Sequence, residues 1–278
     1  MKQKSIVTIQ DISCFGKCSL TVALPIISAM GIGCSIIPTA VLSTHTQFKN
    51  FTFCDLTDEI EKISSHWKEQ NIEFDGIYTG YLGSQEQIDI MARFIDDFRK
   101  EGSIVLVDPA MADNGKLYPG FGDDFPRYMA SLCAKADVID PNLTEATLML
   151  GEPFVGEGYD REYIYSLAKR LCTLGCKTAV VTGVKLEGKH GAVAYESETG
   201  KYSEYLAEDL PVSSHGTGDV FSAALMGAMI LGKDMYESIK IAADFTVSSI
   251  RLTIGDTSHW YGVKFENAIP ELVKAIEA

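Results

Sequence analysis

Short apolar segments alternate with amphipathic helical segments along most of this chain, and that alternation restricts the fold more than any other feature. Strand-like segments lie at residues 5–9, 34–41, 76–80, 103–107, 138–139 and 178–182, and helical spacing of apolar residues at 19–30, 55–70, 87–100, 144–150 and 164–173. Consecutive strands joined by helices pair in parallel, and the crossover helices cover both faces of the sheet. The alternation therefore predicts an α/β fold with a mostly parallel central sheet and helices on both faces.

The last third of the chain adds a predicted hairpin and three further helices. β-rich runs at 191–196 and 202–206 flank a turn, and helical patterns begin at 219, 234 and 265. The 278 residues contain no linker-like break in composition. We therefore expect a single domain over residues 1–278.

Clusters of polar residues follow most of the predicted strands, at 10–13, 43–47, 79–84, 108–113, 140–145 and 182–185. The carboxyl ends of parallel strands lie along one edge of a sheet, where open α/β proteins bind their ligands. We therefore expect these clusters to gather into one site.

The tetrapeptide Gly-Thr-Gly-Asp at 216–219 opens a helix of small apolar residues. Gly216 and Gly218 permit a tight turn, and the N–H groups at a helix start point toward one spot, where anions bind. Asp219 lies beside this spot and could accept a proton from a hydroxyl that attacks a phosphate. The same residues could form an ordinary capped helix start, so the tetrapeptide alone leaves both interpretations open.

Two nucleotide-binding motifs are excluded. Residues 183–190 match a phosphate-binding P-loop except at the last position, where His190 replaces the Ser or Thr that would hold Mg²⁺. The segment also runs into another strand, so we predict a hairpin turn. The Gly-x-Gly-x-x-Gly fingerprint of dehydrogenases is absent from the sequence.

Charge and cysteine content narrow the class of protein further. The formal net charge of −14 argues against nucleic acid or an anionic membrane as a partner. Seven scattered cysteines indicate buried free thiols rather than a disulfide framework. The first residues lead directly into a strand, and no apolar run reaches membrane-spanning length. We therefore expect a cytoplasmic protein.

Five segments, in their order and spacing, resemble the motifs of pyridoxal kinases in the ribokinase-like superfamily. They are Ser-Thr-His-Thr-Gln at 43–47, Thr-Gly-Tyr-Leu-Gly-Ser at 79–84, Asp-Pro-x-Met-x-Asp at 108–113, Pro-Asn-Leu-Thr-Glu at 141–145 and Gly-Thr-Gly-Asp at 216–219. The resemblance spans residues 10–219 and implies a ribokinase-like fold, a homodimer, and ATP-dependent phosphorylation of the 5′-hydroxymethyl group of pyridoxal, pyridoxine or pyridoxamine. It also implies Mg²⁺ as cofactor, ATP as co-substrate and K⁺ as a further candidate ion.

The resemblance assigns a role to each matching residue. Asp219 is the general base, and the N–H groups of Gly216, Thr217, Gly218 and Asp219 hold the charge of the transferring phosphoryl group. Asp108 and Glu145 order Mg²⁺, while Asn142, Thr182 and Gly183 line the ATP phosphates. Thr46, Gln47 and Tyr81 enclose the pyridine ring with His45 close by, and residues 113–124 form a lid. Asn142 and Glu145 also fit an ordinary helix start with a capping box.

Two positions depart from the pyridoxal kinase pattern. Asp11 and Ile12 stand where many members have Ser and His, and Asp-x-Ser at 11–13 is more similar to the hydroxymethylpyrimidine kinases of thiamine synthesis. Asp140 stands where Thr or a small residue often precedes Pro-Asn, and the added carboxylate could alter metal or ATP affinity.

The substrate is therefore less constrained than the reaction. The Asp11 carboxylate can accept a hydrogen bond from a ring hydroxyl or from an amino group, which places it in the substrate site without selecting the substrate. We predict a pyridoxal kinase. Hydroxymethylpyrimidine kinase is the alternative, a sugar kinase is more distant, and a catalytically silent vitamer-binding protein is the hypothesis from another class.

Overall fold

The computed structural model describes residues 2–210 and 215–277 and is organised around one nine-stranded sheet. The strand order is β11-β10-β9-β8-β5-β4-β1-β2-β3. Strands β9 to β2 of this order run parallel, whereas β10 and β11 at one edge and β3 at the other are antiparallel to their neighbours. The bounds are β1 Ser5–Ser13, β2 Gly33–Leu42, β3 Phe53–Asp55, β4 Gly76–Thr79, β5 Ile104–Val107, β8 Val138–Ile139, β9 Thr178–Leu186, β10 Lys189–Glu196 and β11 Lys201–Glu208.

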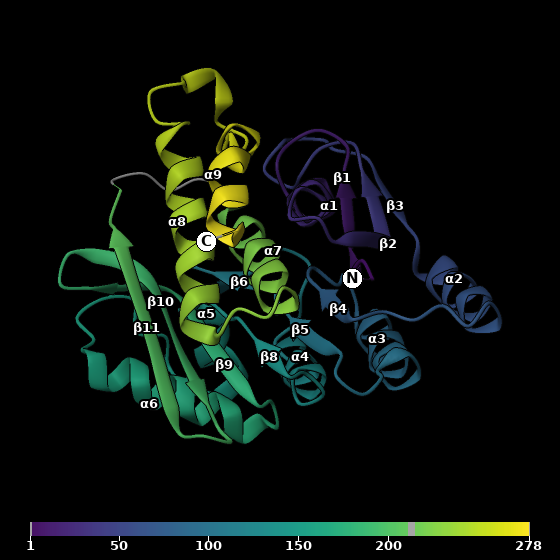
Figure 1. Ribbon diagram of the computed structural model, residues 1–278, viewed down its shortest axis with the longest axis horizontal. Helices are drawn as coiled ribbons and strands as arrows, with labels where there is room; N and C mark the ends of the chain where they lie inside the picture. The colour runs from purple at the N-terminus through teal and green to yellow at the C-terminus, as the bar shows by residue number, and fades with distance from the viewer. Residues whose placement is uncertain (1, 211–214, 278) are drawn as a thin grey trace.

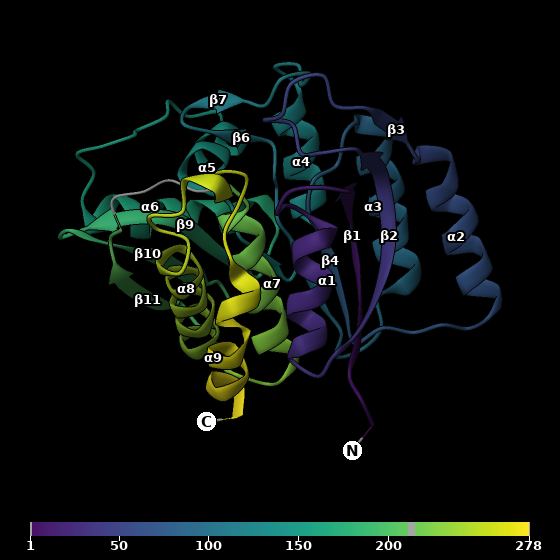
Figure 2. The same cartoon turned by 90° about the horizontal axis from the view of Figure 1, so that it is seen from above.

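Helices cover both faces of the sheet and give three layers (Figure 1, Figure 2). One face carries α1 Leu20–Ala29, α7 Thr217–Ile230, α8 Met235–Arg251 and α9 Phe265–Glu277. The other carries α2 Thr57–Glu69, α3 Gln85–Phe98, α4 Phe125–Cys133, α5 Leu143–Leu150 and α6 Arg161–Leu171. A small hairpin of β6 Ala112–Asp113 and β7 Lys116–Leu117 lies above the sheet's carboxyl edge.

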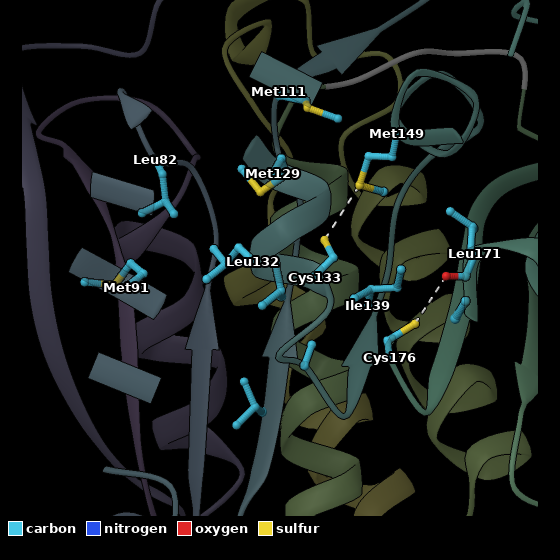
Figure 3. Close-up of a cluster of buried hydrophobic side chains, with 14 of the residues drawn as sticks. Leu82, Met91, Met111, Met129, Leu132, Cys133, Ile139, Met149, Leu171 and Cys176 are labelled. Atoms are coloured by element: carbon cyan, nitrogen blue, oxygen red, sulfur yellow. Dashed lines mark hydrogen bonds between the residues drawn. The ribbon is translucent and has the colours of Figure 1, made fainter. Parts of the chain in front are cut away.

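The alternation of side chains along each central strand builds a separate hydrophobic core on each face. On β5, Val105 and Val107 pack in the core under α2 to α6, and Leu106 between them packs in the core under α7. Figure 3 shows part of the first core, where the Cys133 thiol contacts the Met149 sulfur at 3.6 Å. Burying a valine or leucine side chain, as on β5, stabilises the fold by roughly 1.5–3 kcal/mol. Packing on both faces therefore stabilises the sheet.

The α/β fold with a mostly parallel sheet is confirmed, and so is the hairpin at the P-loop-like segment. Lys189 follows a two-residue turn at Glu187 and Gly188, both with positive φ, which joins β9 to β10. Three features were missed: the short edge strand β3, the β6–β7 hairpin and helix α4.

All seven cysteines are free as expected, but Cys14 and Cys54 are exposed, so the expectation that all are buried is wrong.

The carboxyl ends of the parallel strands lie at one edge of the sheet, and the first turn of α7 reaches the same edge (Figure 2). This arrangement brings several of the predicted polar clusters together. Among the described residues, no helix is both long enough and apolar enough to cross a membrane.

Candidate active site

A cavity of about 150 Å³ lies between the first turn of α7 and the carboxyl ends of β5 and β8. Four carboxylates line it, at Asp108, Asp140, Glu145 and Asp219. The other lining residues are Ala110, Tyr118, Asn142, Thr182, Gly218, Phe221 and Ser222. A second, larger groove of about 250 Å³ between β11, α8 and α9 contains none of the predicted site residues. We therefore take the acidic cavity as the candidate active site.

The backbone around Gly216 fixes the start of α7. Gly216 is the N-cap and has φ +71°, a left-handed conformation that glycine adopts without strain. A Cβ atom at this position would lie 1.8 Å from the carbonyl oxygen of Lys17. The loop before α1 therefore packs directly against the start of α7.

Asp219 lies in the first turn of α7 and is half-buried at the cavity wall. Burial raises the pKa of its carboxyl to about 7, although a hydrogen bond from the backbone N–H of Ser19 favours the charged form. A carboxylate with a pKa near neutrality can accept a proton at physiological pH. The position and the pKa both suit a general base.

Asn142 and Glu145 form the capping box at the start of α5. The Asn142 side chain accepts hydrogen bonds from the N–H groups of Thr144 and Glu145, and the Glu145 carboxylate accepts one from the Asn142 N–H at 2.9 Å. Glu145 Oε1 also accepts bonds from the N–H groups of Met111 and Ala112. The predicted capping box is present, and Glu145 additionally ties the strand-end segment after β5 to α5.

Replacing Glu145 by Gln should destabilise the protein even in the absence of metal and nucleotide. Both Glu145 oxygens accept backbone N–H groups, and an amide NH₂ in place of one oxygen would face a donor. A buried donor left unsatisfied costs about 1–3 kcal/mol, so we expect a fall of that size in the free energy of unfolding, measured by urea denaturation in EDTA. An unchanged free energy would contradict this anchoring role.

Asp11 lies in a separate buried cluster next to Asp219. Its carboxylate accepts hydrogen bonds from the hydroxyls of Ser13, at 3.2 Å, and of Ser19. Since the Ser19 N–H binds Asp219, Ser19 bridges the two carboxylates. Burial raises the pKa of Asp11, and the Asp11 charge in turn contributes to the raised pKa values of Tyr81 and Asp219. Asp11, Tyr81 and Asp219 are therefore brought together, as expected.

His45 is buried and holds the C-terminal segment in place. Its Nε2 lies 2.9 Å from the Tyr261 carbonyl oxygen, so Nε2 carries the proton and Nδ1 accepts the Gln47 N–H. Burial lowers the pKa of His45 and so favours the neutral ring. Its ring packs among those of Phe48 and Trp260. The predicted nearness of His45 to the site is consistent with this, but both ring nitrogens are already engaged.

The remaining predicted residues lie in different positions relative to the acidic cavity. Asp108, Asn142 and Thr182 line the acidic cavity with Glu145, whereas Gly183, at φ +70°, follows Thr182 just outside it. The side chains of Thr46 and Gln47 are exposed, and among the described residues neither makes a hydrogen bond. In the predicted lid, Tyr118 lines the cavity and Phe121 contacts the Tyr81 ring.

Sequence reasoning missed several residues that build the site. Asp140 was noted for a possible effect on metal or ATP affinity but was not placed among the site residues, although it follows a strand as Asp108 does. Ser222 lies one helical turn after Asp219 and so shares its face of α7. Trp260 and Tyr261 come from the connection between α8 and α9, where no local pattern indicated a role.

The four lining carboxylates fit a bound cation. Burial raises the pKa values of Asp140 to about 7 and of Glu145 to about 8, and it raises that of Asp108, which also has other carboxylates nearby. Among the described residues, no three His, Cys, Asp or Glu side chains converge tightly enough to enclose a metal by themselves. Mg²⁺ commonly takes one or two carboxylates and completes its shell with water and phosphate oxygens, so Asp108 and its neighbours suit that ion.

The arrangement has room for a phosphate beside a group that can accept a hydroxyl proton, which are the requirements of a kinase that phosphorylates small alcohols. Comparison with known proteins agrees with this class. A family model described as phosphomethylpyrimidine kinase matches residues 24–262. The chain belongs to this family of pyridoxal and hydroxymethylpyrimidine kinases within the ribokinase-like superfamily, so the predicted ribokinase-like fold is confirmed.

Individual relatives fall into two substrate classes. A pyridoxine kinase of Bacillus subtilis is 31% identical over 199 residues, 68% of this chain and 70% of the relative. A hydroxymethylpyrimidine/phosphomethylpyrimidine kinase of Haemophilus influenzae is 29% identical over 191 residues, 65% of this chain and 69% of the relative. A Bacteroides thetaiotaomicron protein, provisionally named a phosphomethylpyrimidine kinase and crystallised with pyridoxal, superposes with a TM-score of 0.92 at 38% identity, covering 98% of this chain and 96% of that one.

Proposed function

We propose that this protein is an ATP-dependent kinase that phosphorylates the 5′-hydroxymethyl group of pyridoxal, pyridoxine and pyridoxamine. The observation that carries the proposal is the position of Asp219. It stands in the first turn of α7 between the acidic cavity and the buried Asp11 cluster. A base at this point can contact a substrate hydroxyl on one side and the phosphates of a nucleotide on the other.

The residues around Asp219 have different roles in the proposed reaction. Asp219 takes the proton of the attacking hydroxyl, and the Gly218 and Asp219 N–H groups, held by the tight turn at Gly216, stabilise charge on the transferring phosphoryl group. Thr182 and Asn142 line the path of the phosphates. Tyr118, above the cavity, restricts the access of water when the nucleotide is bound.

Mg²⁺ would be held by Asp108 with its waters, and it would neutralise phosphate charge. Glu145 would act on the ion from a distance, because both of its oxygens accept backbone N–H groups.

Two lines of support favour a B6 vitamer as the substrate. The Bacteroides relative, at 38% identity over nearly the whole chain, was crystallised with pyridoxal. In this chain, the partly buried Tyr81 ring lies near Asp11 and provides a flat apolar surface for a pyridine ring. Hydroxymethylpyrimidine is the second candidate, because the buried Asp11 carboxylate could accept a hydrogen bond from its amino group.

A substrate panel with Mg-ATP should therefore give a higher kcat/KM for pyridoxal or pyridoxamine than for hydroxymethylpyrimidine. ADP release reports the rate for each compound. Asp11→Ser should retain measurable pyridoxal phosphorylation, with a loss of about 1–3 kcal/mol in transition-state binding where a buried polar partner is removed. A tenfold or greater preference for hydroxymethylpyrimidine would overturn the B6 assignment and leave the kinase assignment intact.

A further inference from the structure

We propose that the carboxylates of Asp140 and Asp108 together bind a divalent cation of the Mg²⁺ type before any nucleotide arrives, and that nucleotide binding by this chain depends on that ion. The part of the proposal that concerns nucleotide binding rests on the proposed function, because that function makes a nucleotide the second ligand of this cavity. The metal site itself is testable without one.

Strand register places the two carboxylates side by side. β5 and β8 pair in parallel with Val107 opposite Ile139, and Asp108 and Asp140 are the next residues of the two strands. The valine and the isoleucine pack in the core under α2 to α6, so the aspartates that follow them face α7 on the other side of the sheet. There both meet the hydroxyl of Ser222.

The protein leaves this pair without enough hydrogen-bond donors. The Ser222 hydroxyl lies 2.5 Å from Asp140 Oδ2 and 3.4 Å from Asp108 Oδ2, and its one proton serves one of them at a time. The other oxygen, Asp140 Oδ1, is buried and has no hydrogen-bond partner among the described residues. Asp140 is only 3% exposed and lines the cavity. A buried carboxylate oxygen without a partner is costly, so Oδ1 points to a ligand that the cavity receives.

A positively charged ligand suits this cavity best. The described residues that line the cavity include four carboxylates and no lysine, arginine or histidine. A nucleotide phosphate entering this cavity alone would meet uncompensated negative charge. A cation that binds first removes the repulsion and gives the phosphate an attractive partner.

The donor atoms select the kind of cation. Besides the carboxylates, the cavity offers the hydroxyl of Thr182, and it has no cysteine or histidine in its lining. The Asn142 amide also lines it but is engaged with backbone groups. Oxygen donors suit hard ions, and two carboxylates with room for water suit Mg²⁺ or Mn²⁺. Glu145 is the poorer ligand because its oxygens accept backbone N–H groups.

Mn²⁺ titration of the nucleotide-free protein, followed by electron paramagnetic resonance of the free ion, tests the metal site. We expect wild type to bind Mn²⁺, Mg²⁺ to displace it, and Asp140→Asn to bind it about tenfold or more weakly, the size of effect that one buried charge exerts on a neighbour. Asp140→Thr is a second variant without the charge, and thermal unfolding verifies that both variants are folded. Asp96→Asn, which removes an exposed carboxylate paired with Lys135, is the charge-matched control and should behave as wild type.

Calorimetry of ADP binding tests whether nucleotide binding depends on the cation. The effect of Asp140→Asn on ADP affinity should reverse between EDTA and saturating Mg²⁺. In EDTA, Asp140→Asn should bind ADP about tenfold more tightly than wild type, because a repulsive charge is gone; with saturating Mg²⁺ it should bind ADP about tenfold more weakly. A merely structural role would move both affinities in one direction.

Equal Mn²⁺ affinity in wild type and both Asp140 variants, or displacement of Mn²⁺ by K⁺ as readily as by Mg²⁺, would overturn the divalent site. ADP affinities that fail to reverse would overturn the coupling. If wild type binds no ADP under any condition, the nucleotide function fails while the Mn²⁺ titration still decides the metal site.

Discussion

Asp219→Asn is expected to lower kcat by about 10²–10⁴-fold, the usual loss when a general base is removed. Asn has nearly the same size and can still accept the hydrogen bond that the Ser19 N–H donates to this side chain, so the start of α7 should keep its geometry. The amide cannot take the proton of the attacking hydroxyl. Steady-state kinetics with Mg-ATP and pyridoxal measures the loss, and ADP affinity should stay within a few-fold of wild type.

The pH dependence of wild type provides an independent check on the same residue. Burial raises the pKa of Asp219 to about 7, and a general base acts only when it is deprotonated. The kcat/KM of wild type should therefore fall as the pH decreases below about 7 and level off above it, and the residual rate of Asp219→Asn should lack this acidic limb. Turnover of the variant within a few-fold of wild type would remove Asp219 from the role of base.

Much of the fold was predictable because burial on both faces leaves a clear signature in the sequence. The segment at 104–107 is continuously apolar, as a central parallel strand requires when Val105 and Leu106 face different cores. The features that were missed are short or set by tertiary contacts. Strand β3 has three exposed residues and is defined by its pairing with β2, and α4 lies directly after a segment whose glycines and aspartates indicated only a loop.

The site was predictable where a residue's position along a strand determines its place in space. Asp108 and Asn142 follow strands β5 and β8, Thr182 lies within β9, and all three meet in one cavity. The partners of those residues could not be deduced in the same way. That Ser222 stands between Asp108 and Asp140, or that Tyr261 accepts a bond from His45, depends on how α7 and the C-terminal segment dock, and docking is decided by packing over the whole molecule.

Gly216→Ala is expected to remove most of the activity and to lower stability, because Gly216 satisfies two separate requirements. Its φ of +71° is a conformation that costs an L-residue about 1–2 kcal/mol. Its added methyl group would also lie 1.8 Å from the Lys17 carbonyl oxygen, and a backbone oxygen cannot move aside as a flexible side chain can. The loop before α1 or the start of α7 must shift, and the first-turn amides shift with it. We expect a lower melting temperature and a fall in kcat of about 10²-fold or more, as when a donor to the transferring group is lost.

Gly218→Ala is the matched control for stability, two residues further along the same turn. Gly218 has no positive φ, and a Cβ atom there would have no atom within 4 Å. Since alanine favours helix over glycine by about 0.5–1 kcal/mol, this variant should melt at the wild-type temperature or above it. Opposite shifts in melting temperature for the two alanines would show that the left-handed backbone and the close approach to Lys17 at Gly216, and not the loss of a glycine as such, fix the turn at the start of α7. If Gly216→Ala melts like wild type and keeps its turnover, the turn tolerates a side chain and its geometry is not what places the phosphoryl group.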